Sequence, residues 1–274
     1  MKKIVSRFKK RLSITFGLLF IESIAELLFP LVIGIAINDL LNDSYSGLIF
    51  LGVLGLFTVS IGALRRLIDS RAYAYMYVVL GSELASNSSA LSTSKKAAQL
   101  SLLNEIVEFL ENSLPNLFTY IIGLVGTLII LFKLDMSVAI ACVVASLVTL
   151  AIYVVTTRKT VQLNAGWNDE FEKRVDVVAK RNNSITKRHL NRFMKWNIRL
   201  SDLETVNYSL AWLTAIPLLV FTVATTTSAS LEYGSIFAIV MYVFQFIESY
   251  TESPQYYQEW LRLKEISNRI TLNS

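Results

Sequence analysis

The sequence predicts an all-α membrane protein with six transmembrane helices, and two observations carry that prediction. Hydrophobic residues make up 53% of the 274 residues and charged residues only 17%, whereas soluble globular domains carry about a quarter charged residues. A helix needs about 20 apolar residues to cross a bilayer. Residues 12–41 form one mainly apolar segment, and five further runs contain no charged residue, at 44–64, 116–132, 137–157, 208–231 and 233–247.

The first span follows a basic N-terminus at residues 1–11, "MKKIVSRFKKR". Its apolar part is much longer than the core of a signal peptide, about 7–15 residues, and no small-residue cleavage site follows it. We therefore expect it to stay in the protein and to begin a membrane domain over residues 12–270, with a short tail at 271–274. The spans are expected at about 12–41, 44–66, 112–133, 137–157, 207–230 and 234–257.

The distribution of Lys and Arg indicates orientation. Six crossings leave Lys133 as the one basic residue of 26 near an external connection, as the positive-inside rule requires when both termini are cytoplasmic. The net charge of +5 is then a topology signal, and we expect no nucleic-acid partner. The predicted location is the bacterial inner membrane or an equivalent membrane.

The connections between the spans differ in length on the two sides. The external ones are short, "NDSYS", "KLDM" and "SASLEYG", whereas the internal ones, at 67–111 and 158–206, are long and rich in helix-forming residues. We expect the membrane helices to continue into the cytoplasm and to turn near "SNSS" and near "RNNS", because Asn and Ser suit caps and tight turns.

Three stretches carry a resemblance to a known family: "LLFPLVIGIAINDLL", "LEYGSIFAIVMYVFQFIE" and "LRLKEISNRI". In this order, with six spans and two long inner loops, they resemble the membrane domain of type I ABC exporters. Details such as "LIDSRAYAY", "NEIVEFLEN" and "IRLSDLE" look like a subgroup of stand-alone six-span relatives. The resemblance implies the type I exporter transmembrane fold and a homodimer, in which two subunits swap helix pairs and enclose a central cavity.

The sequence lacks the features of an ATPase. Its 274 residues contain no G-x-x-x-x-G-K-[ST] motif, and the dipeptide Gly-Lys does not occur, so no loop is available to hold nucleotide phosphates. We expect that the chain alone is not an enzyme, that it binds no cofactor, and that ATP acts only through a separate nucleotide-binding subunit. Lys96, Ala97 and Ala98 lie where the family usually has a glycine near its first coupling helix.

Acidic residues inside the first and last spans are the strongest functional signal. Glu22 and Glu26 are one helical turn apart in "FIESIAELLFPLVIGIAIN", and Gln245, Glu248 and Glu252 form a polar stripe in the sixth span. A carboxylate in hydrocarbon costs several kcal/mol unless it is neutralised or hydrated. The resemblance places both spans on the central cavity, so these residues are the pathway candidates. The alternatives are neutralisation of Glu22 and Glu26 by arginine, and snorkelling of Glu248 and Glu252 toward the inner interface.

A second group of charges is expected at the inner mouth of the pathway. These residues leave the second span or enter the third: Arg65, Arg66, Asp69, Arg71, Glu105, Glu108 and Glu111. Arg65 and Asp69 form an i,i+4 pair on one helix. The structural interpretation is that these charges pair between helices and set their packing.

The turns of the inner loops are the candidates for docking a partner. They comprise Ser86, Asn87, Ser88 and Ser89 in the first loop, and Ser184, Ile185, Thr186 and His189 in the second. His189 is the only histidine and Cys142 the only cysteine, so we expect no metal site, no disulfide within the chain and no catalytic site. His189 is expected to be solvated or to lie at an interface.

These observations lead to two principal hypotheses. The first is a transport module that resembles the transmembrane subunit of an ABC exporter and moves an amphipathic or cationic compound past the acids. The alternative is an ATP-independent channel or ion-coupled carrier built on the same fold. A third, weaker hypothesis is a non-transporting scaffold. The lipid bilayer, a second copy and a separate ABC ATPase are the expected partners.

Overall fold

The computed structural model describes residues 6–87, 93–179, 182–229 and 231–272. These residues are helical apart from short connections, and no strand occurs among them. Six helices are long and apolar enough to cross a membrane, which confirms the predicted fold class. The elements are α2 (Lys9–Leu41), α3 (Ser46–Asn87), α4 (Thr93–Glu108), the π-helix η1 (Phe109–Ser113), α5 (Leu114–Leu134), α6 (Met136–Glu172), α7 (Arg174–Ala179), α8 (Asn183–Ser228) and α9 (Tyr233–Leu272).

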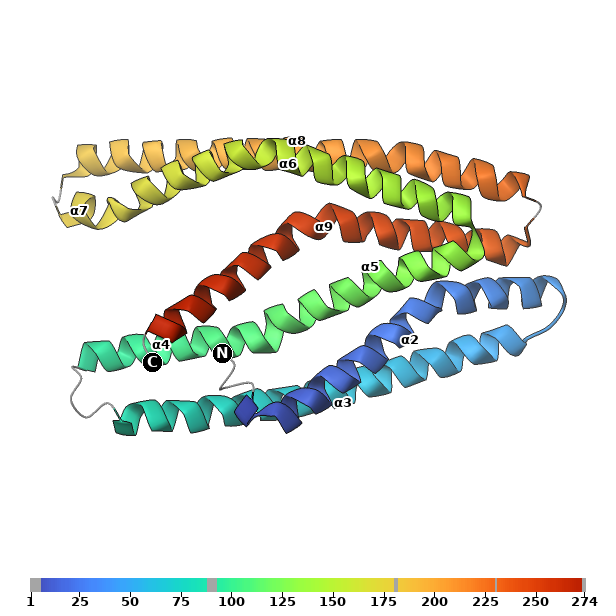
Figure 1. The fold of residues 1–274 in the computed structure, drawn as a ribbon, viewed down its shortest axis with the longest axis horizontal. Helices are drawn as coiled ribbons and strands as arrows, with labels where there is room; N and C mark the ends of the chain where they lie inside the picture. The colour runs from blue at the N-terminus through green and yellow to red at the C-terminus, as the bar shows by residue number, and fades with distance from the viewer. Residues whose placement is uncertain (1–5, 88–92, 180–181, 230, 273–274) are drawn as a thin grey trace. The chain divides into compact units, whose positions relative to one another are not determined.

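The chain divides into two compact units. Unit 1 comprises Met1–Met136 and Thr222–Ser274, and unit 2 comprises Ser137–Phe221. In unit 1, α2 contacts α3, α5 and α9, and α5 also contacts α9 (Figure 1). Helix α2 therefore has the central place in unit 1, because three other helices pack on it.

The turn between α2 and α3 is built by one carboxylate. Asp39 Oδ2 accepts hydrogen bonds from Ser46 Oγ at 2.6 Å and from the Gly47 amide at 2.8 Å. These bonds satisfy the first turn of α3, whose amides have no partner within the helix. Asp43 has a φ of 57°, a left-handed conformation that aspartate tolerates in turns. The short connection predicted at "NDSYS" is therefore present, and it sets the register of α3 along α2.

Helices α2 and α9 approach each other through two glycines. A Cβ atom added at Gly234 would overlap the carbonyl oxygen of Gly34, and a Cβ added at Gly34 would overlap the carbonyl oxygen of Gly234. Asn38 completes this contact, since its Oδ1 accepts from the Gly234 amide at 2.7 Å and its Nδ2 donates to Glu232 at 2.6 Å. The absence of side chains at both positions lets the two backbones touch.

At the other end of unit 1, a hydrophobic core joins α2, α3, α4 and η1. Its most deeply buried members are Tyr73 and Met76 of α3 and Phe109 and Leu110 of η1. Phe8 and Leu12 bring the beginning of the chain onto the same cluster. The C-terminal part of α3 is therefore packed against protein. Its N-terminal apolar part, between about residues 48 and 59, is largely exposed, as expected for a surface that faces lipid.

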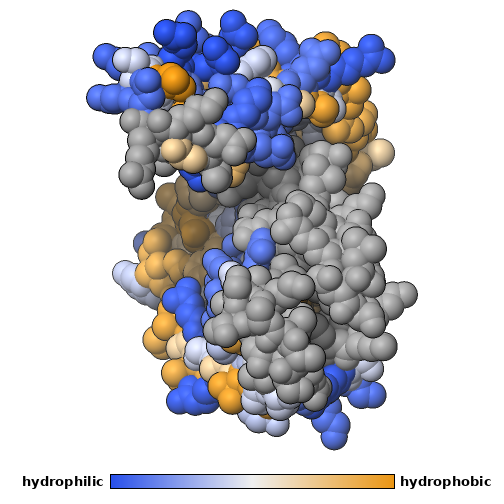
Figure 2. All heavy atoms as spheres, turned by 90° about the vertical axis from the view of Figure 1, so that its left-hand side faces the viewer, coloured by the Kyte–Doolittle hydropathy of each residue, from blue (hydrophilic) through white to orange (hydrophobic). Residues whose placement is uncertain are grey.

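Unit 2 is an antiparallel pair of long helices, α6 and α8, joined through α7 (Figure 1). The hydroxyl oxygens of Thr149 and Thr214 lie 3.0 Å apart between the two helices. At the turn end, Trp167 of α6 stacks on Phe171 and also contacts Phe193 of α8. Figure 2 shows this end of unit 2, in the upper part of the view, covered largely by hydrophilic side chains.

The two inner turns were predicted near "SNSS" and "RNNS". The first overlaps residues 88–92, which lie outside the described residues. At the second, Asn182 Oδ1 accepts from the amides of Ser184 and Ile185, at 3.0 and 3.2 Å. Asn182 is thus the cap that begins α8, in agreement with the prediction that Asn would serve this role there.

The glycine contact gives a first prediction. Gly234→Ala inserts a methyl group where the two backbones touch, and we expect it to destabilise the protein by about 1–3 kcal/mol, as overpacking does. Thermal unfolding of the detergent-purified protein measures this. The matched control is Gly52→Ala, where nothing lies within 4 Å of the added atom. We expect the control to keep or slightly raise the melting temperature, because alanine favours helix. Equal effects of both substitutions would contradict the close contact.

Candidate functional site

Glu22 lies inside the apolar stretch of α2 and is neutralised by α3. Its carboxylate accepts a short hydrogen bond from Arg65 Nε, and Arg65 Nη1 donates to Asp69 Oδ2 at 3.0 Å. Glu22 is 7% exposed and Asp69 6%. Burial of an unpaired charge at this depth would be costly, so one arginine shared by two carboxylates explains why the helices tolerate them. We call these three residues the charge triad.

A glycine on α3 makes room for the triad. A Cβ atom added at Gly62 would lie 2.6 Å from Glu22 Oε1, closer than such contacts normally allow. Gly62 precedes Arg65 by about one helical turn, so it leaves space for the carboxylate that Arg65 binds. The sequence analysis did not identify Gly62. The available signal was a glycine in the second span at helical spacing from two arginines.

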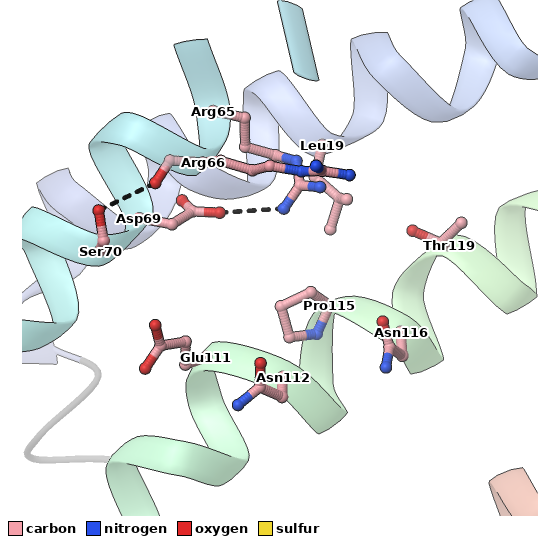
Figure 3. Close-up of a pocket in the computed structure, with 10 residues that line it drawn as sticks. All are labelled: Leu19, Arg65, Arg66, Asp69, Ser70, Glu111, Asn112, Pro115, Asn116 and Thr119. Carbon is pink, nitrogen blue, oxygen red and sulfur yellow. Dashed lines mark hydrogen bonds and ion pairs between the residues drawn. The ribbon is translucent and has the colours of Figure 1, made fainter. Parts of the chain in front are cut away.

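The triad borders two adjoining cavities between α2, α3, η1 and α5, which we call the chamber. The first has a volume of about 320 Å³ and is lined by Leu19, Arg65, Arg66, Asp69, Ser70, Glu111, Asn112, Pro115, Asn116 and Thr119 (Figure 3). The second has a volume of about 220 Å³ and is lined by Leu19, Glu22, Ser23, Glu26, Arg65, Arg66, Asn116 and Thr119. The chamber is thus a polar space beside helices that are mostly apolar.

Three charged side chains of the chamber lie outside the triad. They are Glu26 of α2, Arg66 of α3 and Glu111 of η1. Among the described residues, none of the three forms a hydrogen bond or ion pair through its side chain. Arg66 and Glu26 are exposed and Glu111 is partly exposed. The chamber therefore combines an ion-paired group with charges that, among the described residues, are available to a ligand or to water.

The π-helix η1 places Glu111 and Asn112 on the chamber. The amide of Leu114 bonds to the carbonyl of Phe109, five residues earlier, and Pro115 follows immediately. A proline ring clashes with the carbonyl four residues before it, which is Glu111 here. A wider π turn relieves that clash, and such turns are frequent at functional sites. Asn116 and Thr119 continue the polar face along α5. The sequence analysis did not identify Asn112, Asn116 or Thr119, although their spacing of four and then three residues can be read from the sequence.

The other charges predicted for the inner mouth lie elsewhere. The described residues that line the chamber do not include Arg71, Glu105 or Glu108. Arg71 Nη1 donates to the carbonyl of Leu67 on its own helix at 2.7 Å. The chamber thus brings together Arg65, Arg66, Asp69 and Glu111 from the predicted cluster, with Glu22 and Glu26 from the predicted pathway.

The polar stripe of α9 lies apart from the chamber. Gln245, Glu248 and Glu252 are not among the lining residues of either cavity. Glu248 and Glu252 are exposed, whereas Gln245 is partly buried and its Oε1 has no hydrogen-bond partner in the described part of the chain. The two sets of pathway candidates therefore occupy separate positions on unit 1.

The docking candidates lie at the ends of α3 and α8. Ser86 Oγ donates to the carbonyl of Glu83 in the last turns of α3, and Asn87 ends that helix. Ser88 and Ser89 lie outside the described residues. Ser184, Ile185 and Thr186 form the first turn of α8, where Ser184 and Ile185 are exposed.

Of the two alternatives expected for His189, the solvated one is wrong, because the side chain is 7% exposed and lies between helices α6 and α8 of unit 2. Its Nδ1 lies 3.1 Å from Glu170 Oε1 of α6, and Glu170 is 4% exposed. Lys173 and Arg192 also lie within 4 Å of that carboxylate, at 3.4 and 3.6 Å. The histidine is buried because its ring lies between α6 and α8, within hydrogen-bond distance of a carboxylate that is enclosed by the same two helices.

The triad and the free charges predict different mutational effects. Glu22→Gln removes a buried carboxylate from Arg65, and we expect a loss of about 1–3 kcal/mol of stability. Glu26→Gln, four residues away on the same helix, changes an exposed side chain and is expected to stay within about 0.5 kcal/mol of the parent. Thermal unfolding of the purified variants checks this. Similar melting temperatures for both variants would contradict the triad.

Comparison with protein families was consistent with this architecture. Residues 1–236 match the family model described as the ABC transporter transmembrane region. The match includes every residue that lines the chamber and ends in the first turn of α9. A search of curated proteins found no match. Because the family model covers most of the chain, this protein belongs to the ABC transporter transmembrane family.

Proposed function

We propose that the protein is the transmembrane subunit of an ABC exporter, and that the chamber belongs to its substrate pathway. The observation that carries the proposal is a polar cavity, among the spans of an ABC transmembrane region, lined by three charged side chains that have no partner among the described residues, Glu26, Arg66 and Glu111. Ionisable groups within spans are costly, and they commonly mark pathways for substrates or ions.

The orientation and location follow from the charge distribution. We place both termini and the long helical extensions in the cytoplasm of a bacterial inner membrane, because basic residues concentrate in those segments. The short α2–α3 and α8–α9 turns then face outward. In this orientation the chamber lies toward the cytoplasmic side of the unit 1 helices, where an exporter takes up its cargo.

Two copies form the pathway in this proposal. Residues Ser137–Phe221 make a compact unit of their own, and the pair of spans in that unit is suited to exchange with a second copy, as the family resemblance implies. Most closed oligomers of identical chains are two-fold dimers. We therefore propose a homodimer in which α6 and α8 are the exchanged pair.

ATP hydrolysis is assigned to a nucleotide-binding subunit outside these 274 residues, which contain no Walker A motif. The docking surface is proposed at the ends of the inner extensions. Around the turn of unit 2, in α7 and the first turns of α8, several basic residues are exposed, namely Arg174, Lys187, Arg188, Arg192 and Lys195.

An ATP-independent channel or ion-coupled carrier is the second candidate. The observation in its favour is the same chamber, because unpaired carboxylates and a free guanidinium also suit ion binding without ATP. The two candidates differ in what the protein does alone. An exporter subunit needs its ATPase partner, whereas a channel or carrier does not.

Reconstitution distinguishes the two functions. The protein is placed in liposomes, alone or with a nucleotide-binding subunit that co-purifies with it, and flux of a fluorescent amphipathic cation and of a small-cation tracer is measured. We expect flux only with the partner and ATP, and stimulation of the partner's ATPase by the transmembrane subunit. Glu26→Gln is expected to lower flux without lowering expression. Flux by the protein alone would exclude the exporter proposal and favour the channel or carrier.

Water access to the chamber gives a further prediction. Cys142 is the only cysteine, so Cys142→Ala provides a background without thiols. Glu26→Cys in that background is expected to react with a water-soluble maleimide in membranes, because position 26 borders the chamber. Ala25→Cys is the matched control and is expected to be protected, since Ala25 is buried. Labelling is read by mass spectrometry of the intact protein. Protection of position 26 in every nucleotide state would contradict a hydrated pathway.

A further inference from the structure

The chamber leaves one cation and two carboxylates available after the triad is formed. Arg65 is occupied by Glu22 and Asp69. Arg66 lines both cavities, whereas Glu111 lines only the first and Glu26 only the second. Each cavity therefore contains the same free guanidinium and one free carboxylate.

The free charges of the first cavity lie on different walls. Figure 3 shows Arg66 extending from α3, and Glu111 and Asn112 on the opposite side, on η1. Asn116 lies next along the same wall as Asn112. The side-chain amides thus border the space beside the two charges, where they offer hydrogen-bond donors and acceptors.

A second, independent feature of this cavity is a buried oxygen without a partner. Asp69 is 6% exposed and lines the cavity. Its Oδ2 accepts from Arg65, but its Oδ1 is buried without a hydrogen-bond partner in the described part of the chain. An unsatisfied buried carboxylate oxygen is costly, and a donor supplied by a ligand would satisfy it. Asp69 follows Arg66 by three residues on α3, so the two residues lie on neighbouring turns of one helix, and both line the first cavity.

These charges fit one class of ligand. A simple cation would be attracted by Glu111 but repelled by Arg66. A simple anion would be attracted by Arg66 but repelled by Glu111. We propose that the chamber binds a small zwitterion, with its carboxylate or phosphate on Arg66 and its ammonium group between Glu111 and Asp69 Oδ1. A guanidinium fork suits a carboxylate or a phosphate, and an ammonium group supplies the donors that the two carboxylates lack. The role of this zwitterion as cargo rests on the proposed transport function.

The same chemistry occurs in a free amino acid and in the headgroup of a zwitterionic lipid. The binding experiment therefore uses two sets of probes with the full-length protein in detergent. One set is leucine, its methyl ester and N-acetyl-leucine, which are respectively zwitterionic, cationic and anionic. The other set is glycerophosphoethanolamine, ethanolamine and glycerophosphoglycerol, which are again zwitterionic, cationic and anionic, respectively. Affinities are obtained from ligand-dependent shifts in thermal unfolding and by calorimetry.

We expect the zwitterion of one set to bind at least about tenfold more tightly than both of its singly charged relatives, since each lost charge-assisted contact costs about that factor. A preference within the leucine set would identify a free amino acid as the ligand, and a preference within the glycerophosphoethanolamine set would identify a lipid headgroup. Arg66→Gln is expected to weaken the zwitterion about tenfold, and to leave the cationic probe bound as tightly as before or more tightly, because a repelling charge is removed. Glu111→Gln is expected to weaken the zwitterion similarly, and to leave the anionic probe bound as tightly as before or more tightly, for the same reason.

Two further variants complete the design. Arg66→Lys keeps the charge and is expected to retain the preference for the zwitterion, so it also tests the site if Arg66→Gln fails to fold. Arg71→Gln is the matched control on the same helix, because Arg71 does not line the chamber and bonds to its own helix. It is expected to bind as the parent does.

Equal or tighter binding of a singly charged probe would overturn the inference, as would no binding of either zwitterion at millimolar concentration. These outcomes are separable from the fate of the proposed function, since the assay involves neither an ATPase nor transport. ATP-dependent flux without a preference for zwitterions would reject only the inference. A preference for zwitterions in a protein that supports no flux would reject only the exporter proposal.

Discussion

The structure depends on the neutralisation of Glu22 within the apolar part of α2. A carboxylate at that depth must be paired or hydrated, and Arg65 pairs it while also binding Asp69. This requirement fixes α3 against α2 at one register, because Gly62 and Arg65 must both face Glu22. The turn at Asp39 fixes the same register from the outer end. Two separate polar contacts thus hold a helix pair that apolar packing alone would leave free to slide.

The remaining helices of unit 1 extend this arrangement from α2. Near the C-terminal end of α2 the backbone contact between Gly34 and Gly234 brings α9 onto α2, and near its N-terminal end the core around Tyr73 and Phe109 brings in α4 and η1. The chamber lies among α2, α3, η1 and α5, and each of these four elements contributes polar side chains to its lining.

Most of the fold was readable from the sequence, but the partners within the site were not. Uncharged runs and charge distribution predicted six spans and their order, because the requirement for about 20 apolar residues acts on each helix separately. The selection of Arg65 over Arg66 as the partner of Glu22 depends on the rotation of α3, which no local pattern specifies. The burial of His189 was missed for a similar reason: Glu170, its partner, lies 19 residues away on another helix. The π turn at Phe109–Ser113 has a local cause in Pro115, but the sequence analysis did not predict it.

The neighbouring residues Arg65 and Arg66 show why structural and functional charges can occur together in one span. Successive residues on a helix point about 100° apart, so Arg65 pairs with Glu22 on α2 while Arg66 does not, although both arginines line the two cavities. Arg65 is held by two carboxylates and cannot move to a ligand without exposing Glu22 to an apolar environment. The side chain of Arg66 forms no hydrogen bond or ion pair with any described residue, and it borders both cavities. A fixed charge that keeps the helices together therefore supports a free charge beside it, and the free charge can respond to what enters the chamber without loosening the fold.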